Sequence, residues 1–469
     1  MVHLFIAEQG FRRLFLSMNK LNKEIPHTRH WRVFFIWKRT LILEKLDLRA
    51  EKSLYWRSSY HFYLFCRKRF LDMKKMGRLY ILMLNIFIAM LGFGLIVPVM
   101  PSYIEAFGAT GKTLGFLVAA TGLTQFTLSP IAGALTDRFG RRKLIIAGIA
   151  GFTIAQFIFA FADQLWMLFV SRFLGGAAGA LLMPAMFAYI ADITSEKDRG
   201  KGMGLFSAAM TLGFVIGPGV GGYLVEFGIA FPFLIAGSFA ALSTLLSILF
   251  LPETLTKEKQ EEARLNKDIH FNPFMQMIQA LKTSYGFLFI LAFVLNFGII
   301  HFESIFGLYV DQKHGFTPKD IAFVITVAGL AGVLVQGALV NNCVKRFGEM
   351  RVVRYALLGA AVMLIACRFA PSFWLIFTGS ILFLSATSFV RPALNTLLSK
   401  MAGNQQGVAG GLNTSFMSLA NIIGPSLAGI LFDVNIEFPF MFGTLVLCVS
   451  FIASIVWAKK VSQHAPAVS

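Results

Sequence analysis

The chain has few charged residues and few cysteines. Aspartate, glutamate, lysine and arginine make up 14% of its 469 residues, against 56% hydrophobic residues and a mean hydropathy of +0.68. Soluble domains carry roughly 25% charged residues, so this composition excludes a soluble globular protein. The four cysteines (Cys66, Cys343, Cys367 and Cys448) are scattered, which excludes a disulfide framework and the regular spacing of a metal site.

The motifs of common enzymes are also missing. The chain has no G-x-x-x-x-G-K-[ST] loop to bind nucleotide phosphates, so nothing suggests ATP hydrolysis. It has no Ser/His/Asp, Cys/His or metal-spaced set of side chains that could carry nucleophilic or metal-assisted catalysis. An enzyme is therefore not expected, and neither is a cofactor or a metal ion.

The apolar residues form long runs that predict membrane-spanning helices. Runs of more than about 18 apolar residues can cross the hydrocarbon core of a bilayer as helices. The polar stretch 252–284 separates two groups of such runs, and we expect it to form a connector with an amphipathic helix at the membrane surface. Twelve spans are expected, at about 79–103, 112–136, 144–162, 165–188, 202–226, 231–251, 285–310, 318–343, 352–370, 373–398, 405–432 and 437–458.

The two groups of six spans are copies of one another. TLGFVIGPGVGGYLVEFGIAFPF (residues 211–233) resembles SLANIIGPSLAGILFDVNIEFPF (418–440), and the offset of 207 residues places Glu226 on Asp433. In a very apolar chain, two such halves are the layout of a secondary transporter with its substrate site between them near the bilayer midplane. The sequence therefore predicts an all-α integral membrane protein with twelve transmembrane helices in two pseudo-symmetric six-helix bundles. The expected bundles are 76–251 and 285–460, followed by a tail at 461–469.

The basic residues predict the orientation in the membrane. Lysine and arginine gather in the short loops after spans two, four and eight and in the connector, whereas the other ends of the spans carry only Lys112, Lys313, Lys319 and Arg368. Short loops rich in lysine and arginine stay in the cytoplasm. Both termini are therefore expected to be cytoplasmic.

Residues 1–75 form a basic extension before the first span. Residues 1–78 hold +12 of the net charge of +19, without a nucleic-acid motif or a convincing signal peptide. Two interpretations compete. The segment could be a basic, aromatic arm that lies on anionic lipid headgroups, or translation could begin at Met73 or Met76, directly before the first span. The second interpretation is the favoured one.

The loop after span two carries GALTDRFGRRK, residues 133–143. Length and spacing resemble G-x-L-x-D-R-x-G-R-[KR], the signature loop of the major facilitator superfamily. Asp137 can pair with a neighbouring arginine or lie at the N-terminus of a helix, so the cluster could hold the halves together on the cytoplasmic side and break when the protein opens inward. Positive-inside anchoring alone would explain the arginines but not Asp137. In the second half Lys345 stands at the position equivalent to Asp137, which predicts a latch in the first half only. The latch motif comprises Gly133, Asp137, Arg138, Gly140 and Arg141.

Span five carries small residues four positions apart, which let two helices pack backbone to backbone, and a proline that bends the span. The pattern resembles that of superfamily members that exchange their substrate for protons. The alternative is a packing motif without directional meaning. The antiporter motif comprises Gly213, Gly217, Pro218, Gly221 and Gly222.

One acidic residue lies well inside a span. Glu303 is eight residues from Asp311, or about 12 Å along a helix, whereas the other acids of the spans lie at their edges. A carboxyl in a low dielectric can load and release a proton near neutral pH, so Glu303 is the expected proton carrier. It could instead bind a cationic substrate from a water-filled cavity. Arg172 lies at a similar depth in span four, where an arginine is expensive and indicates function.

The strings FESIFGLY, FVRPALN, GVAGGLNTSF and IIGPSLAGILFDVNIE, together with the span pattern from about Met76 to the end, resemble the NorA/Bmr/Blt-type quinolone and multidrug efflux pumps of Gram-positive bacteria. The resemblance implies that Glu303 and Arg172 are the central charged positions. It also implies that Ser388 replaces a second acid of these pumps, which puts the proton stoichiometry and the preference for dicationic drugs in doubt. The implied cavity residues are Gln125, Met183, Phe214, Phe306 and Asn421.

The implied function is proton-driven export of amphipathic, often cationic drugs, such as quinolones and dyes, by alternating access. The proton gradient would supply the energy. Expected partners are small amphipathic substrates, protons and the lipid bilayer of a Gram-positive cell membrane, with no nucleic acid and a monomeric chain. Two alternatives stay open: an exporter or flippase of an endogenous lipid or metabolite, and a non-transporting membrane receptor or assembly factor.

Overall fold

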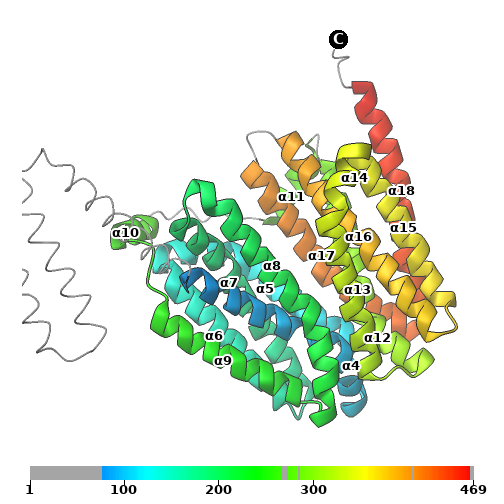
Figure 1. Ribbon diagram of the computed structural model, residues 1–469, viewed down its shortest axis with the longest axis horizontal. Coiled ribbons are helices and arrows are strands. Elements are labelled where there is room, and N and C mark those ends of the chain that lie inside the picture. Colours follow the sequence, from blue (N-terminus) through cyan, green and yellow to red (C-terminus); the bar gives the residue numbers. More distant parts are fainter. Residues whose placement is uncertain (1–76, 266–272, 284–285, 403–405, 465–469) are drawn as a thin grey trace, which may run out of the picture. The chain divides into compact units, whose positions relative to one another are not determined.

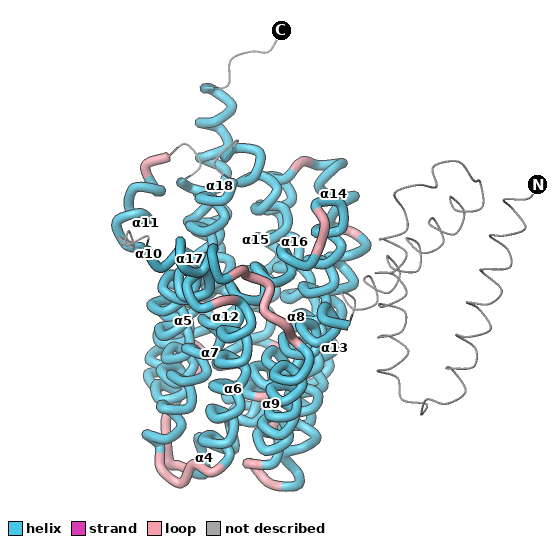
Figure 2. Tube along the Cα trace, turned by 90° about the vertical axis from the view of Figure 1, so that its left-hand side faces the viewer, coloured by secondary structure: helices cyan, strands magenta, loops and turns pink. Residues whose placement is uncertain are grey.

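The computed structural model describes residues 77–265, 273–283, 286–402 and 406–464. All described residues belong to one compact unit, Lys74–Ser469. The predicted extension 1–75 lies outside the described residues, as do parts of the connector and the end of the tail. The described residues form helices joined by short loops, without a strand (Figure 2).

Within the described residues, eleven helices are long and apolar enough to cross a membrane, and the bent pair Gly111–Ser129 and Ile131–Phe139 makes a twelfth. This confirms the prediction of an all-α, multispan membrane protein. The helices are Gly77–Gly94, α4 (Ile96–Ala106), α5 (Gly111–Phe139), α6 (Arg141–Ala160), α7 (Leu165–Ile193), α8 (Glu196–Leu224), η1 (Val225–Phe227), α9 (Phe231–Phe250), α10 (Lys257–Leu265), α11 (Pro273–Leu281), α12 (Gly286–His314), α13 (Pro318–Ala338), α14 (Val340–Phe347), α15 (Glu349–Phe369), α16 (Phe373–Ala402), α17 (Gln406–Val434) and α18 (Phe438–His464) (Figure 1).

Two predicted spans are interrupted. The first is divided at Leu95 into the helix Gly77–Gly94 and α4. Pro98 explains this break, because proline has no backbone N–H and its ring presses on the carbonyl four residues before it, that of Gly94. The eighth span ends at Ala338, five residues earlier than predicted, and α14 follows after Leu339.

The helix contacts repeat the duplication of the sequence. α6 packs against α7 and α9 in the first half, as α15 packs against α16 and α18 in the second. Between the halves, α17 lies along α5, and α13 lies along α8 (Figure 1). These two interfaces are equivalent, because the offset of 207 residues relates α5 to α13 and α8 to α17.

Among the described residues, the close contacts between the halves gather towards one end of the bundle. We call the end that carries the latch motif the basic end, and the other the opposite end. Towards the opposite end, a Cβ on Gly115 would collide with the carbonyl of Pro425, and a Cβ on Gly222 with that of Pro318. Four glycines nearer the basic end have no atom within 4 Å of such a Cβ: Gly133, Gly204, Gly337 and Gly410. The close contacts between the halves that glycines permit therefore lie towards the opposite end.

Candidate functional site

Glu303 lies on the most enclosed span. In α12, 67% of the apolar window is buried inside the protein, against 56% or less in the other spans. One turn beyond Glu303, a Cβ on Gly307 would lie 2.7 Å from the carbonyl of Val97 in the other half. Glu303 itself is half-buried. It thus lies beside the close contacts between the two halves.

Arg391 of α16 lies within electrostatic range of Glu303. Arg391 is exposed, and its Nη2 donates to Oδ1 of Asn296 on α12 at 3.1 Å. Asn296 in turn donates through Nδ2 to Asn421 Oδ1 of α17 at 2.5 Å and to the carbonyl of Met417 at 2.9 Å. A chain of hydrogen bonds therefore links Arg391 of α16 through Asn296 of α12 to α17.

Arg172 does not lie beside Glu303. Its side chain is 6% exposed and its guanidinium lies over the ring of Phe159, 4.3 Å from the centroid. The phenol of Tyr103 is the ionisable group that acts on it, and its Nε has no hydrogen-bond partner. The structure therefore brings Glu303 together with Arg391, not with Arg172.

The cavity residues implied by the resemblance lie on both halves. Gln125 is half-buried on α5, where its Nε2 would lie 3.7 Å from a Cβ on Gly179 of α7. Met183 is one turn further along α7 and packs at the edge of the first half's core. Phe214 of α8 is 37% exposed and faces no core cluster.

The remaining residues of the set belong to the second half. Asn421 joins the network described above. Ser388 donates to the carbonyl of Leu384 at 2.7 Å, and its Oγ lies 2.7 Å from where a Cβ on Gly332 would be. Phe306 is 1% exposed and packs on Phe302 with ring centroids 4.8 Å apart. In this conformation Phe306 is therefore covered by protein.

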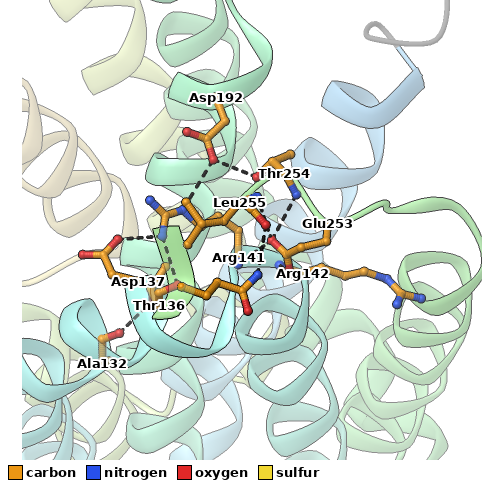
Figure 3. Close-up of polar contacts among 10 residues, drawn as sticks. Ala132, Thr136, Asp137, Arg141, Arg142, Asp192, Glu253, Thr254 and Leu255 are labelled. Atoms are coloured by element: carbon orange, nitrogen blue, oxygen red, sulfur yellow. Dashed lines mark hydrogen bonds and ion pairs between the residues drawn. The ribbon is translucent and has the colours of Figure 1, made fainter. Parts of the chain in front are cut away.

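The latch motif forms a polar cluster at the basic end (Figure 3). Arg141 Nη1 donates to Asp137 Oδ1 at 2.6 Å and to the carbonyl of Thr136 at 3.0 Å, and Arg141 Nε lies 3.4 Å from Asp192 Oδ2 of α7. Arg138 Nε donates to the carbonyl of Ala263 in α10 at 3.3 Å. Among the described residues, Asp137 and Arg141 contact only the first half. Their hydrogen bonds and ion pairs therefore do not connect the halves in this conformation.

Glu253, just after α9, completes this cluster. Its carboxylate accepts the backbone N–H groups of Arg141 at 2.9 Å and Arg142 at 3.2 Å, at the N-terminus of α6 (Figure 3). An anion in this place satisfies unpaired N–H groups and complements the helix dipole. Gly140 has a φ of +95°, and a Cβ there would collide with Glu253. Only glycine fits this turn.

The antiporter motif is a close contact between two helices of the first half. A Cβ on Gly217 of α8 would lie 2.6 Å from the carbonyl of Leu91 and 2.8 Å from Cα of Gly94, and one on Gly221 would lie 2.8 Å from the carbonyl of Leu95. Gly213 meets the same helix one turn earlier. The prediction that these glycines allow backbone-to-backbone packing is confirmed; a role in exchange stays a prediction.

Two polar contacts join the halves at the opposite end. Lys319 Nζ of α13 lies 2.5 Å from Glu226 Oε1 of η1. The backbone N–H of Lys112, at the start of α5, donates to Asp433 Oδ2 of α17 at 3.1 Å. The offset of 207 residues relates Lys112 to Lys319 and Glu226 to Asp433. The two contacts are thus symmetry-related, and we call them the paired end contacts.

Three functional candidates were not predicted as site residues: Arg391, Asn296 and Glu253. The R-P of FVRPALN draws attention to Arg391, because an arginine inside a span is expensive. Asn296 gives a weaker signal, since asparagine occurs in many helices. Glu253 follows span six directly, and nothing in its local sequence indicates that it caps α6.

A duplicated helical bundle with a carboxyl and a guanidinium inside its spans is typical of a secondary transporter. The chain belongs to the Major Facilitator Superfamily, which it matches over residues 82–342 and 288–468. It is 40% identical over 386 residues to "Multidrug resistance protein 2" of Bacillus subtilis, an alignment that covers 82% of this chain and 96% of the relative. It is 36% identical over 366 residues to "Quinolone resistance protein NorA" of Staphylococcus aureus, covering 77% and 92%. The expected family is confirmed: this is a multispan transporter related to multidrug efflux pumps.

Solved structures confirm the fold. The human organic anion transporter MFSD10 superposes with a TM-score of 0.60 at 21% identity, covering 81% of this chain and 99% of that one. The nucleoside transporter NupG superposes with a TM-score of 0.65 at 12% identity, covering 83% and 100%. At these identities the likeness concerns the fold alone.

Proposed function

We propose that this protein exports amphipathic, often cationic drugs in exchange for protons. The observation that carries the proposal is the place of Glu303 on α12, half-buried inside a span and one turn from the close contact of Gly307 with the other half. A carboxyl beside the contact of the halves can face one side of the membrane and then the other as the halves rock. The relatives named for multidrug and quinolone resistance support the same substrate class.

The basic end is the cytoplasmic end in this proposal. Its loops carry the arginines of the latch motif together with Lys345 and Arg346, and such loops remain inside. The conformation described is then inward-facing, and both termini are cytoplasmic. The rocking bodies are the bundles 76–251 and 285–460, joined by the connector 252–284.

In the proposed cycle, Glu303 loses its proton to the cytoplasm and a cationic drug is loaded. Closure of the basic end then opens the opposite end. A proton from outside binds Glu303 and favours release of the drug. Gln125, Met183, Phe214 and Asn421 would contact the drug in the inward-facing state, and Phe306 and Ser388 after rearrangement of the second half.

Dye efflux tests this function. Cells that lack their own pumps would express the wild-type chain, Glu303→Gln and a chain that begins at Met76, each loaded with ethidium with and without an imposed pH gradient. We expect gradient-driven efflux from wild type, its loss in Glu303→Gln at equal protein level, and full efflux without residues 1–75. Norfloxacin would serve as a second substrate.

If wild type moves neither ethidium nor norfloxacin, the drug-export proposal fails. Export of an endogenous lipid or metabolite would then be the better account of the same scaffold. If efflux is intact in Glu303→Gln, the drug remains a substrate but Glu303 is not the proton carrier.

A further inference from the structure

Asn296 uses both ends of its amide at the centre of the second half. The residue is 4% exposed, so its polar atoms depend on protein partners. Its Oδ1 accepts from Arg391, and its Nδ2 donates to Asn421 and to the carbonyl of Met417. Because a guanidinium only donates, reversing the amide would place two donors against one another. Arg391 and α17 therefore hold Asn296 in one orientation.

This hydrogen-bonded chain ends at the contact between the halves. Asn421 lies on α17, which packs along α5, and its carbonyl is 3.0 Å from where a Cβ on Gly122 of α5 would be. Gly122 thus allows α5 to approach Asn421 closely. A displacement of Asn296 would move α17 through these hydrogen bonds and so change its contact with α5.

The same asparagine lies on the helix that carries Glu303. Asn296 precedes Glu303 by seven residues on α12, so both lie on one face, about 10 Å apart along the axis. Among the described residues, Arg391 forms no ion pair within 4.0 Å, although its charge acts on Glu303. The hydrogen bond to Asn296 therefore competes with an approach of Arg391 to Glu303.

We propose that Asn296 is a positioning residue, which sets the separation of Arg391 and Glu303 and transmits a change in that separation to the contact of α17 with α5. Loss of the proton from Glu303 increases its attraction for Arg391 and weakens the Arg391–Asn296 bond. Proton uptake restores that bond and the orientation of the amide. This inference rests on the proposed proton exchange at Glu303.

Among the described groups near this part of α12, Arg391 is the charged group that Asn296 contacts. α17 presents the neutral Asn421. His301, on another face of α12, lies between the carbonyls of Gly424 at 3.1 Å and Pro439 at 2.9 Å. Asp311 is two turns beyond Glu303, where Glu105 of α4 acts on it.

Two substitutions at this position should move the pH dependence of transport in opposite directions. The midpoint pH is that at which gradient-driven ethidium transport by purified protein in liposomes is half-maximal. Asn296→Asp places a fixed negative charge beside Arg391, so that Glu303 keeps its proton to higher pH and the midpoint rises by about half a unit or more. Asn296→Ala releases Arg391 towards Glu303, and the midpoint falls by a similar amount.

Asn413→Ala is the matched control. Asn413 of α17 donates to Asn395 of α16 at 3.3 Å, an asparagine pair without a charged partner, so its loss should leave the midpoint unchanged. Shifts of both Asn296 variants in one direction, or no shift at normal protein level, would overturn the inference. If neither Asn296 variant accumulates in the membrane, Asn421→Asp is measured instead. We expect it to raise the midpoint pH by a smaller amount, and an unchanged midpoint would overturn the inference.

The same assay distinguishes failure of this inference from failure of the proposed proton exchange. Wild type and Glu303→Gln are measured first. If wild-type transport ignores the pH gradient, or Glu303→Gln retains gradient-driven transport, the proposed exchange fails. If both behave as proposed and the Asn296 variants do not shift, only the positioning role is refuted.

Discussion

Arg172 is a buried cation that the first half stabilises with aromatic rings. Among the described residues no acid lies within 4.0 Å of it, and the ring of Phe159 covers its guanidinium. A cation–π contact contributes on the order of 1–2 kcal/mol when desolvated, whereas burying an unpaired charge costs several kcal/mol. A structural requirement therefore does not explain an arginine at this position.

Arg172→Met should separate stability from function. We expect thermal unfolding in detergent at the wild-type temperature or a few degrees above it, because an apolar side chain replaces an unpaired charge. Gradient-driven efflux should be lost. A variant that unfolds earlier yet still exports ethidium would show that Arg172 is structural. Phe159→Leu, which keeps the arginine but removes the aromatic ring, should lower the unfolding temperature.

Glu437 offers a pH test at the opposite end. Hydrogen bonds from Lys313 at 2.9 Å and from Arg368 lower the pKa of this carboxyl. A carboxyl with a lowered folded-state pKa stabilises the protein above its unfolded value, near 4.3, and this contribution is lost as the pH falls through the folded value. Glu437→Gln should thus unfold earlier than wild type at pH 7, and the difference should shrink below about pH 4. A difference that is constant with pH would contradict this account.

At the residue scale, the sequence was informative where a side chain is unusual for its surroundings. Glu303 could be predicted because it is the acid well inside a span. That Arg391 faces it could not, because α16 and α12 meet only through tertiary packing. The same holds for Glu253, whose role as a helix cap depends on how closely the end of α9 approaches α6.

The close interface of α8 with the first span depends on glycine residues. A Cβ on Gly217 would collide with two backbone groups, the Leu91 carbonyl and the Cα of Gly94. Backbone atoms cannot move aside as a flexible side chain can. Gly217→Ala should therefore destabilise the protein by about 1–3 kcal/mol and reduce transport, as measured by thermal unfolding and efflux.

The control is Gly204→Ala on the same helix. A Cβ on Gly204 has no neighbour within 4 Å, and alanine is the better helix former by up to about 1 kcal/mol. We expect unchanged or slightly higher thermal stability. Equal losses in Gly204→Ala and Gly217→Ala would refute the close-contact explanation.

At the element scale, hydropathy predicted the spans well because the bilayer imposes long apolar helices. It could not reveal the break at Leu95, since apolar residues continue through it and the cause is Pro98 against Gly94. In the described part of the connector the structure has two helices, α10 and α11, and α11 buries Met277 and Ala280 while Ile278 is 55% exposed. That this stretch forms an amphipathic helix at the membrane surface stays a prediction.

At the scale of the whole molecule, the duplication determines how the halves meet. The paired end contacts, Glu226 with Lys319 and Asp433 with the N-terminus of α5, close the opposite end symmetrically. The sequence predicted two equivalent halves. It could not predict which end is closed, because the same sequence encodes both states of a transporter.

Neutralising the paired end contacts should open the opposite end more often. An exposed ion pair and a carboxylate at a helix N-terminus contribute about 0.2–1 kcal/mol each. Glu226→Gln with Asp433→Asn should therefore shift the two-state equilibrium by roughly two- to thirtyfold. The reporter is Thr326→Cys, whose position faces Gly219 across the closed end, where the Thr326 Oγ1 is 3.1 Å from a Cβ on that glycine. The native cysteines would be replaced by alanine.

Labelling of Thr326→Cys by a water-soluble maleimide should be correspondingly faster in the double variant. Gly204→Cys, at an exposed position without a neighbouring atom within 4 Å of its Cβ, should be labelled no faster. An unchanged rate at Thr326→Cys would mean that backbone packing alone holds this end closed.

The most direct test of the account is proton movement coupled to drug movement in liposomes that contain only this protein. A pH-sensitive dye inside the vesicles would report protons while ethidium or norfloxacin is added outside, for wild type and Glu303→Gln. The account predicts drug uptake accompanied by proton efflux in wild type, and neither gradient-driven uptake nor drug-dependent proton efflux in Glu303→Gln. Drug uptake without proton movement, or coupled movement that survives Glu303→Gln, would contradict proton exchange at Glu303.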